Sequence, residues 1–109
     1  AFKAQGISVI VPDSRGQKRV MDAIYGGIKA GVTGGASRKA ILATAAALIR
    51  KGAQAIVAGC TEIPLVLRDE DIPVPFIEPM RIAARVAIER AGGKVRISQG
   101  KGTKFKKSI

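Results

Sequence analysis

The sequence predicts an α/β protein with a three-layer architecture, in which a parallel β-sheet is flanked by helices. Three short and continuously apolar runs predict the strands, at residues 7–11, 54–58 and 74–77. Parallel strands are buried on both faces, so they lack the alternation of apolar and polar residues seen in half-exposed strands. Longer segments with apolar residues at helical spacing separate the runs, which is typical of a sheet covered by helices.

Each element in the first part of the chain has a local signal. The chain opens on residues typical of a last helical turn, with Gly6 where a left-handed cap would fall. The strand 7–11 is rich in Ile and Val and stops at Pro12. Asp13 or Ser14 can cap the helix that follows. The predicted apolar face of this helix consists of Val20, Met21, Ile24 and Ile28.

A glycine-rich connection over residues 26–35 separates the first long helix from a second one. The second helix is expected to start near Ala36 or Ser37 and to end at Gly52, after a basic pair that suits a helix C-terminus. Its predicted apolar face consists of Ile41, Leu42, Ala45, Leu48 and Ile49.

The second half of the chain alternates short elements with turns. After the strand 54–58, residues 65–67 are expected to be a short helical or irregular piece, and residues 69–71 a surface loop. Pro75 suggests that the strand 74–77 lies at an edge or near a strand start. Pro79 suits the first position of a closing helix. The residues expected to face inward from this helix are Ile82, Ala83 and Val86.

Composition limits the chemistry that the chain can perform. The 109 residues are enough for one domain with a modest core. One cysteine and no histidine exclude an intrachain disulfide, a zinc site of the usual Cys/His kind, and a Ser-His-Asp or Cys-His device. The apolar runs are shorter than the roughly 18 residues of a membrane span, and no signal peptide is recognised, so we expect a cytoplasmic protein.

The net charge of +11 is unevenly distributed. Residues 94–109 hold six basic and no acidic residues, and without them the balance is +5. We therefore divide the chain into a globular part, 1–93, and a basic tail, 94–109, that is predicted to be disordered. Such a tail could touch phosphate without sequence preference. Phe105 is the only aromatic residue in the tail, so specific recognition of nucleic-acid bases is not expected.

The carboxyl ends of the predicted strands are the expected place for a site, because ligands bind there in open α/β sheets. Residues 12–14, 59–62 and 78–80 follow the three strands, and Lys29 in the glycine-rich connection could reach the same rim. A thiol at residue 60, near a helix start, would be biased toward the thiolate. Lone cysteines, however, often pack as small hydrophobes, and Thr61 with Glu62 could simply cap a helix. The residues alone leave both readings open.

The sequence Gly-Cys-Thr-Glu-Ile-Pro-Leu at 59–65 resembles the second cysteine motif of the cofactor-independent aspartate/glutamate racemases. The similarity is closest to the aspartate racemase and broad-specificity amino-acid racemase branch. It extends upstream through residues 15–25 and 27–31, and downstream through residues 74–80. These segments occur in the order and spacing of the family and cover most of residues 5–92.

The resemblance implies a racemase in which two cysteines flank the substrate Cα, one removing a proton as thiolate and the other delivering one as thiol. Cys60 would be one of the pair. Thr61 would hold the α-carboxylate of the substrate, Lys29 would receive a side-chain carboxylate, and Glu62 would be an orienting group. The resemblance brings no cofactor and no metal. The substrate would be a small amino acid, aspartate or glutamate above all.

The sequence departs from the family in one large respect. These racemases have two similar lobes, and the match covers only the second lobe and the closing helix. The first lobe, with its Cys-Asn-Thr-like motif and the partner cysteine, has no counterpart here. We therefore expect a chain that cannot racemise alone and whose partner is the missing N-terminal lobe, with a homodimer left open. The alternative is a non-catalytic module whose basic tail binds anionic partners such as nucleic acid.

Overall fold

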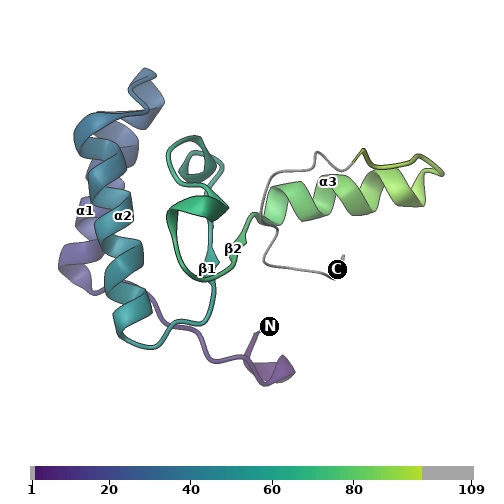
Figure 1. The fold of residues 1–109 in the computed structure, drawn as a ribbon, viewed down its shortest axis with the longest axis horizontal. Coiled ribbons are helices and arrows are strands. Elements are labelled where there is room, and N and C mark those ends of the chain that lie inside the picture. Colours follow the sequence, from purple (N-terminus) through teal and green to yellow (C-terminus); the bar gives the residue numbers. More distant parts are fainter. Residues whose placement is uncertain (1, 97–109) are drawn as a thin grey trace.

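Two antiparallel helices form one side of the molecule and a small parallel sheet lies beside them (Figure 1). The computed structural model describes residues 2–96, and the rest of the predicted basic tail lies outside this range. The regular elements of the described residues are α1 (Ser14–Gly26), α2 (Gly35–Arg50), β1 (Ile56–Val57), β2 (Phe76–Ile77) and α3 (Pro79–Arg90). Single 3-10 turns complete them: η1 (Lys3–Gln5), η2 (Ile28–Ala30), η3 (Ile63–Leu65) and η4 (Asp69–Asp71).

Helix α1 begins where the sequence predicts. The Asp13 carboxylate accepts a hydrogen bond of 2.8 Å from the backbone N–H of Gly16, which satisfies one of the free donors of the first turn. Ile24 is buried, as is Ile28 just beyond the helix, whereas Met21 is exposed. The apolar face is therefore narrower than predicted.

Helix α2 begins at Gly35, slightly earlier than expected, and is followed by Gly52 in a left-handed conformation with φ 102°. Its buried residues are Ile41, Thr44 and Ala45. The hydroxyl of Thr44 donates to the carbonyl of Ala40 at 2.9 Å, so this buried polar group has a partner.

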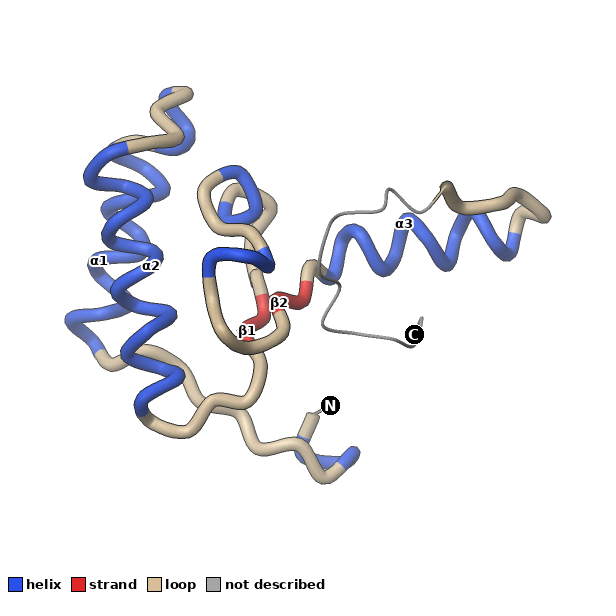
Figure 2. Tube along the Cα trace, viewed as in Figure 1, coloured by secondary structure: helices blue, strands red, loops and turns tan. Residues whose placement is uncertain are grey.

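The sheet consists of β1 and β2, paired in parallel with Ile56 opposite Phe76 (Figure 2). Ile56 and Phe76 are buried and belong to the same core as the inner residues of α1 and α2. Val57 points away from this core and is 47% exposed. One face of the sheet is therefore covered and the other is open.

The predicted strand 7–11 is not a strand. Residues 7–13 have no regular structure, and Val9 and Val11 are 60% and 69% exposed. A strand exists through hydrogen bonds to a neighbouring strand, and β-propensity without such a partner does not make one. The described residues therefore hold two strands rather than three, and a three-layer sheet is not formed among them.

Helix α3 begins at Pro79 as predicted, but it extends away from the rest of the molecule (Figure 1). None of its residues is buried: Ile82 is half-buried, while Ala83 and Val86 are exposed. The prediction that these residues face inward is wrong for Ala83 and Val86, because no other described segment packs on that face. Within residues 2–96, no helix has both the length and the apolar character needed to cross a membrane.

Candidate functional site

The strand β1 delivers Cys60 to the carboxyl edge of the sheet. Ala58 is buried, Gly59 is exposed, and the Cys60 side chain is half-buried against the core. The thiol itself donates a hydrogen bond to Oε2 of Glu62. The apolar run therefore fixes the backbone, while the sulfur atom lies among polar groups.

Glu62 links all the residues that the sequence singled out. Its Oε2 also accepts a hydrogen bond of 3.1 Å from the Thr61 hydroxyl, and its Oε1 lies 3.9 Å from Nζ of Lys29. Two hydrogen bonds lower the pKa of Glu62 below its usual value: the larger effect is that of the Cys60 thiol and the smaller is that of the Thr61 hydroxyl. Glu62 is therefore a carboxylate at neutral pH.

Lys29 reaches the site from the other side, on η2. Ile28 anchors this turn in the core at 3% exposure, and Gly31 closes it with φ 83°, a conformation that glycine adopts without strain. The ammonium of Lys29 also lies 4.8 Å from the centre of the Tyr25 ring, close enough for a cation–π contact. The glycine-rich connection thus brings a cation to the carboxylate that accepts the hydrogen bond of the thiol, at the rim that the sequence suggested.

The short turn η3 begins three residues after Cys60, and the expected bias of the thiol toward the thiolate stays a prediction. One expectation about this edge is wrong. The loop 12–14 lies elsewhere: Asp13 is near Lys51, which precedes β1, whereas Cys60 follows it. The reason is that the segment before Asp13 pairs with no strand. Residues 78–80 do follow β2 at the same edge as Cys60.

Sequence reasoning missed two residues near the site. The Arg38 guanidinium on α2 binds both carboxylate oxygens of Asp71 and the carbonyl of Val66. Asp71 was expected in a surface loop, but it lies in the turn η4 and its side chain is only 14% exposed. The two partners are 33 residues apart, so no local pattern could reveal the pair.

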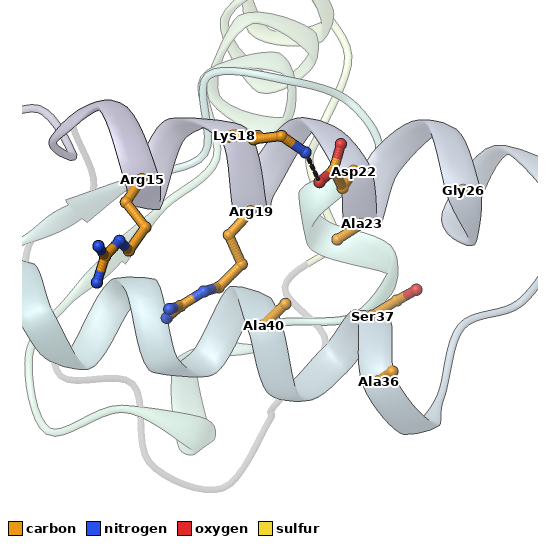
Figure 3. Close-up of a pocket in the computed structure, with 9 residues that line it drawn as sticks. All are labelled: Arg15, Lys18, Arg19, Asp22, Ala23, Gly26, Ala36, Ser37 and Ala40. Carbon is orange, nitrogen blue, oxygen red and sulfur yellow. Dashed lines mark hydrogen bonds and ion pairs between the residues drawn. The ribbon is translucent and has the colours of Figure 1, made fainter.

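A groove between α1 and α2 has a volume of about 480 Å³ (Figure 3). Arg15 and Arg19 extend across it from α1, and Lys18 is paired with Asp22 on the outer face. The groove contains none of the residues predicted for the site. In the part of the chain that the structure describes, no three His, Cys, Asp or Glu side chains gather in a way that could hold a metal ion.

Two comparisons with known proteins place the chain in a family. Residues 1–87 match the family model for Asp/Glu/hydantoin racemases, and the chain belongs to this family. The chain is also similar to the crystal structure of a provisionally assigned Asp/Glu racemase from Yersinia pestis, with a TM-score of 0.75 and 34% sequence identity. That similarity covers 82% of this chain but 39% of the Yersinia pestis chain, so this chain spans about two fifths of that protein.

Proposed function

We propose that this chain is part of a cofactor-independent amino-acid racemase and that Cys60 exchanges a proton with the substrate Cα. The cluster in which Cys60, Glu62 and Lys29 meet supports the proposal, since it joins a proton carrier to groups of both charges. The family match supports the reaction class. It does not favour the alternative of a non-catalytic anion-binding module.

The hydrogen bond to Glu62 suits Cys60 to deliver a proton. The S–H group donates a hydrogen bond to Oε2 of Glu62, which orients it at the edge of the sheet. We infer that Cys60 hands its proton to Cα after a partner cysteine has removed one from the opposite face. Cys60 then becomes the thiolate, and it acts as the base in the reverse reaction.

Lys29 and Thr61 are proposed to hold the substrate. The side chain of Lys29 is 47% exposed and its contact with Glu62 is long, at 3.9 Å, so its ammonium remains available to a side-chain carboxylate of aspartate or glutamate. A point charge on a flexible stem suits that task. Thr61 is exposed beside the thiol, where its hydroxyl could turn from Glu62 to the α-carboxylate.

The second cysteine is proposed to come from a separate lobe that completes the protein. A single thiol reaches one face of Cα, so the chain alone should not racemise. Residues 1–93 would form one lobe, and the exposed apolar residues of the segment 7–11 and of α3 would pack against the other. Those residues include Val9, Val11, Met80, Val86 and Ile88.

Restoring the other lobe tests the role of Cys60. Residues 1–93 replace the matching portion of the Yersinia pestis relative, and conversion between the L and D enantiomers of aspartate and of glutamate is followed by circular dichroism. We expect racemisation by the chimera and a fall of at least about a hundredfold in Cys60→Ser, because general acid–base groups contribute roughly 10²–10⁴-fold. Thr33→Ser, in the connection before α2, is the control. Racemisation that survives Cys60→Ser would end the proposal for Cys60.

A further inference from the structure

The first turn of α2 contacts both halves of the candidate site. Ser37 packs against Gly27, which starts the turn that carries Lys29. Arg38, the next residue, binds the segment that carries Cys60 and Glu62. Neighbouring residues of one helix thus hold the cation and the thiol–carboxylate pair.

The Arg38 contact is a fork of charged hydrogen bonds. Nη1 lies 3.0 Å from Oδ2 of Asp71, Nη2 lies 2.8 Å from Oδ1, and Nη1 also donates to the carbonyl of Val66. Asp71 in turn accepts a 2.8 Å hydrogen bond from the backbone N–H of Arg68. A bidentate pair fixes both distance and orientation, which a single lysine ammonium does not.

Val66 and Glu62 lie at opposite ends of one short turn. The N–H of Leu65 donates to the carbonyl of Glu62 at 3.1 Å, and the N–H of Val66 donates to that of Ile63 at 3.1 Å. Ile63 is buried in the core. Because the turn is compact and anchored, a group that fixes the Val66 carbonyl also fixes the backbone of Glu62.

The turn η2, which carries Lys29, is held against the same helix by a close contact between Gly27 and Ser37. A Cβ on Gly27 would lie 2.0 Å from Oγ of Ser37 and 3.2 Å from Cβ of Ser37, so the Gly27 backbone packs directly on the Ser37 side chain, where glycine leaves the room that this contact needs. The gap of 3.9 Å between Lys29 and Glu62 is therefore set through two adjacent positions of α2.

We propose that Arg38 is a positioning residue, which holds Cys60 and Glu62 opposite Lys29 through its fork with Asp71 and Val66. The inference rests on the proposed function in one respect only: that function gives the reason why Cys60, Glu62 and Lys29 have to be aligned. Its test needs no racemisation, so the two can fail separately.

The test uses two alkylating reagents of the same size and different charge. Iodoacetate is an anion and iodoacetamide is neutral. The rate of alkylation of Cys60 by iodoacetate, divided by its rate with iodoacetamide, therefore reports how close the Lys29 cation lies to the thiol. We expect Lys29→Gln to lower this ratio about two- to fivefold, the range for a partly exposed charge contact. Arg38→Lys, Arg38→Gln and Asp71→Asn are expected to lower it toward the Lys29→Gln value, because the site loses its alignment.

Matched controls separate the positioning effect of Arg38 from the loss of a positive charge and from a general loosening of the fold. Lys39→Gln removes a cation from the same turn of α2, and Asp22→Asn breaks the exposed pair with Lys18; both should leave the ratio unchanged. Ethylguanidinium added to Arg38→Ala should restore the ratio, which an unfolded chain would not allow. If Arg38→Lys raises both rates together and keeps the ratio, or if the guanidinium has no effect, Arg38 is merely structural and the inference is overturned.

Discussion

At the residue scale, the hydrogen bond between Cys60 and Glu62 is the feature with the most chemical consequence. The acceptor is ionised at neutral pH, since its hydrogen bonds lower its pKa below the ordinary value of 4.5. One oxygen of this carboxylate accepts the hydrogen bond from the Cys60 thiol, and the other lies 3.9 Å from Nζ of Lys29. The carboxylate is therefore the nearest charged group to the thiol, and its removal tests what it does there.

Replacing this carboxylate should make the thiol more reactive. We expect Glu62→Gln to raise the rate of iodoacetamide alkylation at neutral pH by roughly tenfold, because it removes a negative charge that lies 2.5 Å from Sγ of Cys60 at the edge of the molecule. Glu70→Gln is the matched control, because Glu70 is exposed and pairs only loosely with Arg68, at 4.0 Å. Equal rates in Glu62→Gln and the unaltered chain would show that the carboxylate does not restrain the thiol.

At the element scale, the contribution of the short turn η3 and the residues after it to stability depends on which of their side chains are buried. Leu67, just after the turn, is 1% exposed, whereas Leu65 within it is 57% exposed. The segment after Cys60 is thus attached to the core by one leucine and presents the other to solvent.

The two leucines should differ strongly in their effect on stability. Leu67→Ala removes buried methylenes and leaves a cavity, so we expect it to lower the free energy of unfolding by about 2–5 kcal/mol. Leu65→Ala makes the same chemical change at the surface and should stay within about 0.5 kcal/mol. Urea unfolding followed by circular dichroism measures both. Equal losses would mean that the core does not extend to this turn.

The sequence correctly predicts those helix starts that depend on neighbouring residues alone. Asp13 caps α1 and Pro79 opens α3, and both are visible in the sequence. The strand 7–11 could not be judged in this way, because its existence depends on a partner strand elsewhere in the chain. The same holds for the site. Residues 60–62 form one motif and Lys29 belongs to a glycine-rich connection that could be expected at the same rim, whereas the pair of Arg38 with Asp71 arises only in the fold.

At the scale of the whole molecule, the chain is more extended than a compact domain of its size. Its radius of gyration is 15.0 Å, against about 13 Å for a compact domain of 100 residues. The projection of α3 contributes to the difference (Figure 1). A fold with so open a shape relies on the few polar contacts that tie its segments together.

Those contacts make the molecule sensitive to acid. The Arg38 fork lowers the pKa of Asp71 from 3.8 to about 2, and a backbone hydrogen bond from Gly16 lowers the pKa of Asp13. A carboxyl group whose pKa is lower in the folded state binds protons more readily when unfolded. Its contribution to stability is therefore complete above the unfolded pKa and is lost as the pH falls toward the folded one.

The unfolding free energy should accordingly be steady near neutral pH and fall as the pH drops from about 4 to about 2, where Asp71 becomes protonated in the folded chain. Asp71→Asn should be less stable at neutral pH and should show a flatter profile in this window, because its largest acid-sensitive contact has gone. Asp22→Asn, which alters an exposed pair at 2.7 Å, should keep the profile of the unaltered chain. Urea midpoints measured across the window decide the matter: parallel profiles for Asp71→Asn and the unaltered chain would place the acid sensitivity elsewhere. A flattened profile would show that one ion pair, between residues far apart in the sequence, joins α2 to the segment that carries Cys60.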